Sequence, residues 1–160
     1  RDAASIRRLD WIVAQLSAGR KDPVLIMTGQ MGIVACHIAK KHFGKVKFMD
    51  RYGLTDRTFT SCPATRGLPR GRLGLKLSYE RYFAKAPEIV GLCRAPRPDI
   101  VFDIGSAPDS RVEQNGYKIV YCQTWTVQAG SARLPGKPVP ADEFIAVRTE
   151  LLEALSAPRR

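Results

Sequence analysis

The chain of 160 residues has few of the residues that most catalytic or metal sites need. It contains only two histidines, His37 and His42, and its four cysteines form no C-x-x-C pair. Because a structural zinc site needs closely grouped thiolate or imidazole ligands, we expect no metal. The sequence also lacks a G-x-S-x-G nucleophile motif, and both histidines lie in a segment with helical periodicity. We therefore interpret them as surface or helix-end histidines, not as general bases.

Long hydrophobic runs are absent too. Nothing approaches the ~18 consecutive apolar residues of a transmembrane helix, and no signal peptide is visible. The composition, 44% hydrophobic and 26% charged, is typical of one soluble globular domain with a single core. The chain begins at Arg1 and not at Met, so we expect residues 1–160 to be a fragment or a processed product.

Acidic residues are scarce relative to basic ones. The 26 Lys and Arg outnumber the 15 Asp and Glu, which gives a formal net charge of +11. Such an excess favours polyanionic partners, including anionic lipid, acidic polysaccharide and nucleic acid, and is equally compatible with a solvated basic surface. Single-strand nucleic-acid binding also needs aromatic residues interleaved with the basic ones. Residues 79–83 come closest but fit a half-buried helix equally well, so we expect no specific nucleic-acid partner.

A strand–helix–strand unit organises the first third of the chain. An apolar run at residues 24–27 predicts a buried strand, a helical pattern follows from Ile33 to Gly44, and a second strand at 46–49 ends at Asp50. A crossover of this kind places the two strands parallel in one sheet. Ligands of such sheets bind beyond the carboxyl ends of the strands.

The remaining pattern completes an α/β domain. We predict a first helix at Asp2–Leu16, short helices at 73–83 and 87–92, strands at Ile100–Ile104 and Lys118–Thr126, and a terminal helix that begins at Ala141. Residues 130–140 are rich in glycine and proline and show no pattern. The expected fold is a single three-layer α/β domain, with a mostly parallel, four- or five-stranded sheet and helices on both faces.

The glycines after the first strand suggest one enzyme class. Gly29-x-x-Gly32, followed about twenty residues later by the acid Asp50, has the outline of a unit that binds a dinucleotide or S-adenosylmethionine. The full G-x-G-x-x-G fingerprint is absent, however. Residues 101–106 look like the glycine turn of a methyltransferase, but the chain after them is too short for the strands that should follow. A small Rossmann-like S-adenosylmethionine- or nucleotide-binding enzyme is therefore the alternative.

The cysteines divide into two pairs by context. Cys36 lies in the helical pattern and Cys122 in a strand pattern, where cysteine usually behaves as a small core residue. Cys62 and Cys93 lie in loop-like segments with prolines nearby. If the compartment is oxidising, Cys62 and Cys93 are the pair that we expect to form a disulfide.

Several motifs carry a more particular resemblance. They are Asp50-x-x-Gly53-Leu54-Thr55-Asp56, the Arg- and Pro-containing stretch Pro63–Arg72, Pro98-Asp99 before an apolar strand, and Gly116-Tyr117 before another. In this order they resemble the soluble C-terminal domain of GT-C type membrane glycosyltransferases, most nearly the arabinofuranosyltransferase-like bacterial members. The resemblance covers roughly Trp11 to Tyr121. One departure is that family members often have Gly-His after the arginine stretch, whereas Gly74 is followed here by Leu75.

The resemblance implies an extracytoplasmic domain, periplasmic or extracellular, that follows a transmembrane domain of the same protein. In the family, acidic residues of upstream loops transfer the sugar from a polyprenyl-phosphate donor, so the parent would be a glycosyltransferase. The fragment itself would be non-catalytic and without a cofactor. Its expected partners are a glycan or polyprenyl-phosphate-linked sugar and an anionic membrane surface.

The residues that would contact the ligand are polar or basic and follow the second strand: Asp50, Tyr52, Gly53, Asp56, Arg66, Arg70 and Arg72. Carboxylates can accept hydrogen bonds from sugar hydroxyls, and arginines can hold phosphate or uronate groups in a forked geometry. Alternatively, Asp50 and Asp56 only fix a turn in which Gly53 has a positive φ. A third hypothesis is a basic interaction module that binds many polyanions alike.

Overall fold

A computed structural model describes residues 3–28, 32–50, 96–104, 110–131 and 134–156. These residues form an α/β fold, as predicted. The elements in chain order are α1 (Ala3–Ser17), β1 (Val24–Thr28), α2 (Ile33–Lys41), β2 (Val46–Asp50), β3 (Ile100–Ile104), α6 (Ser110–Gln114), β4 (Tyr117–Ser131), β5 (Leu134–Arg148), the 3-10 turn η2 (Thr149–Leu151) and α7 (Leu152–Ser156).

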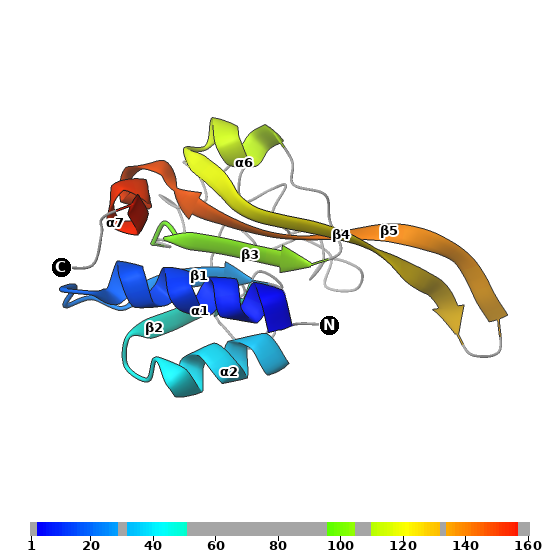
Figure 1. Cartoon of the computed structure of the whole chain (residues 1–160), viewed down its shortest axis with the longest axis horizontal. Helices are drawn as coiled ribbons and strands as arrows, with labels where there is room; N and C mark the ends of the chain where they lie inside the picture. Colours follow the sequence, from blue (N-terminus) through cyan, green and yellow to red (C-terminus); the bar gives the residue numbers. More distant parts are fainter. Residues whose placement is uncertain (1–2, 29–31, 51–95, 105–109, 132–133, 157–160) are drawn as a thin grey trace, which may run out of the picture.

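The five strands form one mixed sheet in the order β2-β1-β3-β5-β4 (Figure 1). Strand β1 is parallel to both β2 and β3, whereas β5 is antiparallel to β3 and to β4. The predicted parallel arrangement is thus correct for the first three strands, and a long antiparallel hairpin completes the sheet. Because β2 lies on one side of β1 and β3 on the other, the strand order reverses at β1.

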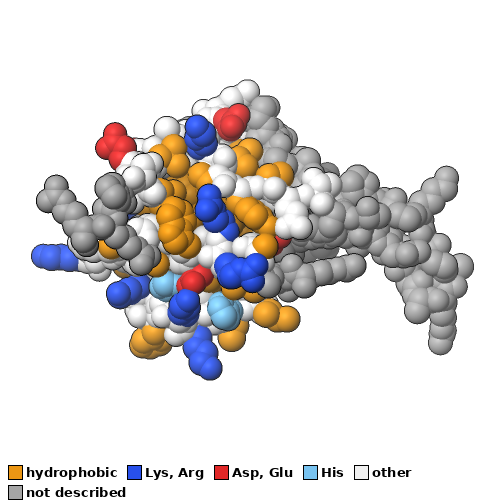
Figure 2. All heavy atoms as spheres, in the orientation of Figure 1, with side chains coloured by type: hydrophobic (Ala, Val, Ile, Leu, Met, Phe, Trp, Pro, Cys, Tyr) orange, Lys and Arg blue, Asp and Glu red, His pale blue; other side chains and the backbone are white. Residues whose placement is uncertain are grey.

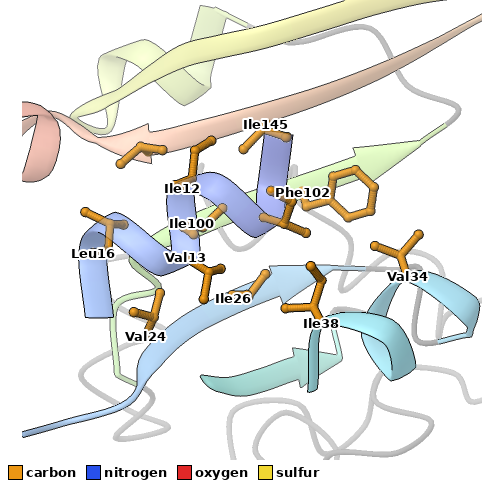
Figure 3. Close-up of a cluster of buried hydrophobic side chains, with 12 residues drawn as sticks. Ile12, Val13, Leu16, Val24, Ile26, Val34, Ile38, Ile100, Phe102 and Ile145 are labelled. Atoms are coloured by element: carbon orange, nitrogen blue, oxygen red, sulfur yellow. The ribbon is translucent and has the colours of Figure 1, made fainter. Parts of the chain in front are cut away.

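Helices α1 and α2 cover one face of the sheet, where the main core lies (Figure 3). The apolar positions of α1 recur at helical spacing, and those of β1, β3 and β5 recur at every second residue, so each element presents one apolar side. Burying each such side chain contributes about 1.5–3 kcal/mol. The cluster consists of Leu9, Ile12, Val13, Leu16, Val24, Ile26, Val34, Ile38, Ile100, Phe102, Ile145 and Val147.

The alternate residues of the same strands are buried as well. Leu25 and Met27 of β1, Met49 of β2, Val101 of β3 and Ala146 of β5 are all less than a tenth exposed. A sheet buried on both faces explains why these strands appear in the sequence as continuous apolar runs.

The predicted terminal helix is wrong over most of its length. Residues 141–148 belong to β5, and helical structure begins only at Thr149. The spacing of Phe144, Val147 and Leu151 fits a helix, but the uninterrupted run from Phe144 to Val147 also fits a central strand. All four residues of that run are fully buried between β3 and β4, so burial on both faces decides in favour of the strand.

The hairpin extends further than its sequence suggests. Strand β4 continues past Thr126 to Ser131, and β5 begins at Leu134, within the segment that we predicted to have no pattern. Only residues 143–147 of β5 pair with β3, so the distal part is a two-stranded ribbon in the described structure. A strand with one open side tolerates proline, which is why the prolines of β5 do not prevent pairing.

Most other predicted elements are confirmed. The first helix, the first two strands and the intervening helix are found within a few residues of their expected bounds, and β3 matches its prediction. The prediction that Cys36 and Cys122 are core residues is wrong, since both are exposed. Cys36 lies on the outer side of α2, and Cys122 lies on β4, the edge strand. The predicted helices at 73–83 and 87–92 lie outside the described residues.

Candidate functional site

The carboxyl edge of the parallel strands is where the sequence places a ligand. Thr28, the last residue of β1, pairs with Asp50 at the end of β2 and with Phe102 near the end of β3. The structure therefore places position 50 beside the end of β1, at the point where the strand order reverses. The other predicted ligand contacts and the predicted disulfide lie outside the described residues: Tyr52, Gly53, Asp56, Arg66, Arg70, Arg72, Cys62 and Cys93.

The glycine that opens α2 does not have the left-handed backbone for which glycine is most often required. Gly32 has φ −80° and ψ −122°, so its backbone is not in the left-handed region. A Cβ atom added there would meet nothing within 4 Å. In a dinucleotide fingerprint, glycines allow a tight turn, a close approach to phosphate or tight packing of helix on strand. Gly32 meets neither the tight-turn nor the packing criterion.

The two histidines have the roles predicted for them. His37 is exposed on α2, and His42 caps the carboxyl end of that helix. Its Nε2 lies 2.7 Å from Asp10 of α1, and the Lys41 ammonium donates to the same carboxylate at 2.6 Å. Burial alone would raise the pKa of Asp10, but the hydrogen bonds from Lys41 and His42 bring the pKa below its usual value. These contacts join α1 to α2.

At the opposite end of the strands, where β1 and β3 begin, a buried carboxylate accepts several hydrogen bonds. Asp99, just before β3, accepts hydrogen bonds from the Leu25 amide at 2.9 Å and from the guanidinium groups of Arg148 at 2.6 Å and Arg20 at 3.2 Å. The residue is only 3% exposed. These bonds tie the start of β1, the start of β3 and the end of β5 together. The Pro98-Asp99 motif of the resemblance therefore has a structural role here.

The Gly116-Tyr117 motif packs against the same segment. The Tyr117 hydroxyl donates to the Pro98 carbonyl at 2.7 Å, and the Arg97 guanidinium lies 5.1 Å above the centre of the Tyr117 ring. Arg97 also donates to the Asn115 carbonyl at 2.6 Å. Burial raises the pKa of Tyr117 to about 12, although the nearby Arg97 opposes the shift. We call residues 97–99 and 115–117 together the clasp.

The outer side of α2 is basic and also carries apolar residues, and we call it the α2 surface. It consists of Ile33, His37 and Lys40 on the helix and of Phe43 and Lys45 in the turn that follows it. Ile33 is 76% exposed and Phe43 is 91% exposed. Figure 2 shows hydrophobic side chains among Lys and His side chains in its lower part, where α2 lies in Figure 1.

A hollow of about 440 Å³ lies between α1 and β4, lined by Ala4, Arg7, Arg8, Trp11, Val120 and Tyr121. Strand β4 shifts its register against β5 between Ile119 and Tyr121. Because of this bulge, both Val120 and Tyr121 pack against the core cluster beneath α1, instead of alternating between faces. This site is not predicted from the sequence, since only the bulge places Tyr121 beside Arg7. The paired arginines and Trp11 on the polar side of the first helix were the available signal.

Among the described residues, no three His, Cys, Asp or Glu side chains gather in a way that could hold a metal ion. Among the helices of the described residues, none combines the length and the apolar character needed to cross a bilayer.

Comparisons with known proteins assign no family. No family model matches the chain, and no curated protein sequence matches it. A solved structure of a proposed RNA methyltransferase from Pyrococcus horikoshii superposes with a TM-score of 0.35 at 12% sequence identity, covering 86% of this chain and 81% of that one. A similarity at this TM-score does not support a conclusion about fold or function.

Proposed function

We propose that this chain is a non-catalytic domain of a polytopic glycosyltransferase-like membrane protein, held at the periplasmic or extracellular face of the membrane. There it would help to position a glycan or lipid-linked acceptor. The observation that supports this proposal best is the α2 surface, which combines two exposed apolar side chains with lysines. Such a combination is typical of surfaces that lie in the headgroup region of an anionic bilayer.

The lysines of the α2 surface are available for lipid. Within the described residues, Lys40 and Lys45 form no ion pair, whereas Lys41 is engaged with Asp10. The surface extends over the eleven residues from Ile33 to Phe43, a length of ~15 Å along a helix. Its two apolar ends could therefore touch the same bilayer while the lysines contact headgroups between and beside them.

The energies fit a domain that is tethered to the membrane by another part of its protein. Each lysine near an anionic surface contributes about 1 kcal/mol, and partial insertion of Phe43 and Ile33 adds ~1–2 kcal/mol. A total of ~4 kcal/mol corresponds to a dissociation constant of about 1 mM. This affinity is weak for a free protein. It is sufficient where a covalent link keeps the effective concentration near the millimolar range.

The ligand contacts of this proposal are those at the carboxyl edge: Asp50, Tyr52, Gly53, Asp56, Arg66, Arg70 and Arg72. The position of Asp50 beside the end of β1 supports a site there, because ligands of open α/β sheets bind where the strand order reverses. We also propose that the sheet is the middle of three layers, since its residues are buried on both faces.

Vesicle sedimentation tests the membrane part of the proposal. The chain should bind vesicles with 30% anionic lipid and should not bind neutral vesicles. Both F43S/I33S and K40E/K45E should reduce binding at least fivefold. The matched control K47E/K118E makes the same charge change at two exposed lysines, one on the face of β2 that points away from α2 and one on β4, and should reduce binding less than twofold. Equal losses in the two charge-reversal variants would contradict a specific surface.

An NMR titration tests the ligand part. A short-chain polyprenyl-phosphate sugar or a glycan should shift the amide signals of residues 50–72 by more than those of the clasp. If neither ligand shifts these signals, the proposed contacts are wrong.

A small S-adenosylmethionine- or nucleotide-binding enzyme is the second candidate. The register of Thr28 against Asp50 favours it, because an acid at this position can bind ribose hydroxyls. Calorimetry with S-adenosylhomocysteine and with NAD separates the two, since only the second candidate requires that either one binds.

A further inference from the structure

The hollow between α1 and β4 combines two aromatic rings with two guanidinium groups. Trp11 is 36% exposed, and the Arg8 guanidinium lies 5.1 Å from the centre of its ring. This stacking holds Arg8 at the rim of the hollow in a defined orientation. Arg7, one residue earlier, lies close enough to Tyr121 to influence the pKa of its hydroxyl. Rings and cations thus line the same space.

The two arginines are not used in ion pairs within the described part of the chain. Three other arginines of the described residues, Arg20, Arg97 and Arg148, each bond to an acidic side chain. The buried carboxylate of Glu143 is the acid that acts on Tyr121, together with burial, to raise its pKa. Arg7 and Arg8 carry two positive charges and Glu143 carries one negative charge, so the hollow has a net positive charge. An anionic ligand would be attracted, and each guanidinium can hold a phosphate with two parallel hydrogen bonds.

The Tyr121 hydroxyl is already engaged. It lies 2.5 Å from Oε1 of Gln123, the next residue on the same face of β4, to which it donates. Because this hydroxyl is protonated and bonded, Tyr121 can offer its ring to a ligand but not a nucleophile or a base. Among the lining residues, none is positioned for covalent chemistry, so the hollow is suited to binding.

We propose that this hollow binds a phosphorylated sugar, with the sugar ring against Trp11 and Tyr121 and the phosphate between Arg7 and Arg8. The volume of about 440 Å³ lies within the usual range for small-molecule sites. This inference rests on the proposed function and adds to it, because it names a second contact for a lipid-linked sugar. Helix α1 covers the same face of the sheet as α2, so the hollow and the α2 surface belong to one side of the molecule.

Two-dimensional NMR titrations of the full chain with four probes test the assignment. The probes are glucose 1-phosphate, glucose, inorganic phosphate and AMP. Glucose 1-phosphate should shift the Trp11 indole signal and the Tyr121 amide signal with a dissociation constant at least fivefold lower than that of any other probe. Equal binding of inorganic phosphate would show an anion site without sugar recognition and would overturn the proposal. Tighter binding of AMP would assign the hollow to nucleotides and would also overturn it.

Matched variants locate the binding. R7Q/R8Q removes two exposed charges and should weaken glucose 1-phosphate binding at least tenfold. K21Q/K47Q removes two exposed charges, one before β1 and one on β2, and should change binding less than twofold. W11L should weaken binding at least threefold while the circular dichroism spectrum stays unchanged. If both double variants weaken binding equally, the interaction is general electrostatic attraction and the proposal is wrong.

The outcomes remain separable from those of the proposed function. Loss of vesicle binding in F43S/I33S depends on α2 alone, and R7Q/R8Q leaves that surface intact. A chain that binds anionic vesicles but no phosphorylated sugar would refute the hollow while keeping the membrane-associated domain. A chain that binds the sugar phosphate but no vesicles would refute the membrane association instead.

Discussion

The hydroxyl of Tyr117 donates a hydrogen bond to the carbonyl oxygen of Pro98 at 2.7 Å. This bond joins the two motifs, Pro98-Asp99 and Gly116-Tyr117, that contribute to the resemblance with GT-C glycosyltransferase domains. Both lie where β3 and β4 begin, at the edge opposite to the carboxyl ends of the parallel strands. They therefore maintain the sheet, and any ligand specificity must come from other residues.

Replacing Tyr117 by Phe should change how stability depends on pH. Burial raises the pKa of Tyr117 from 10.0 to about 12, so the folded state keeps its proton at a pH where the unfolded state has lost it. The unfolded chain is then favoured as pH rises from about 10 to 12. The wild type should lose ~2–3 kcal/mol of unfolding free energy from this residue over that interval.

Urea unfolding of wild type and Tyr117→Phe at pH 7, 10 and 11.5 measures the effect. At pH 7 the variant should be less stable by about 1 kcal/mol, because the Pro98 carbonyl loses its donor. Lysines also titrate in the alkaline range, but they are common to both proteins. The gap should therefore shrink or reverse at pH 11.5, and a constant gap would contradict the raised pKa.

Gly116 should tolerate no side chain. Its φ is +78°, and a Cβ atom would lie 2.8 Å from Nη2 of Arg97. The left-handed conformation costs a residue with a side chain about 1–2 kcal/mol. In Gly116→Ala the Arg97 guanidinium must also move and lose its bond to the Asn115 carbonyl, which adds ~1 kcal/mol.

Two other glycines provide controls for Gly116→Ala. Gly19 and Gly44 have φ of +73° and +74°, and an added Cβ would meet nothing within 4 Å at either position. In thermal unfolding, the alanine variants of Gly19 and Gly44 should lose only the stability that the left-handed conformation costs a residue with a side chain. In an Arg97→Ala background the excess cost of Gly116→Ala should disappear. An excess that persists there would show that the Arg97 contact is not its cause.

The sequence predicted those parts of the fold in which local pattern and burial agree. In the strand at 100–104 and in the unit from Val24 to Asp50, the spacing of the apolar residues fits only one assignment of helix and strand. The structure contains both segments as predicted. The helix predicted at residues 141–148 is wrong because an apolar run with helical spacing fits both a helix and a buried strand. The choice between them depends on β3 and β4, which are distant in sequence.

The candidate site was less predictable than the fold. The pairing of Thr28 with Asp50 follows from the parallel strands and was anticipated. The hollow was not, because it depends on a register shift in β4 that brings Tyr121 under α1. No local pattern marks a bulge of this kind, since a single extra residue leaves the apolar character of the strand unchanged.

Among the described polar side chains, Asp99 is the one whose removal should reduce the free energy of unfolding most. It is buried, and it accepts bonds from the Leu25 amide, Arg148 and Arg20. In Asp99→Ala the Leu25 amide would be buried without an acceptor and Arg148 would lose its counter-charge. We expect a loss of ~2–4 kcal/mol, measured by urea unfolding at pH 7.

Two further variants separate charge from hydrogen bonding at this position. Asp99→Asn keeps an oxygen for the Leu25 amide but turns the attraction to Arg148 into a contact between two donors, so its loss should be roughly half that of Asp99→Ala. Glu150→Gln is the exposed comparison, because Glu150 is half exposed and pairs with Arg97 at 3.4 Å and with Arg148 at 3.6 Å. An exposed pair contributes less than about 1 kcal/mol. Equal stability of Asp99→Ala and Glu150→Gln would show that the buried carboxylate does not join β1, β3 and β5 as the hydrogen bonds indicate.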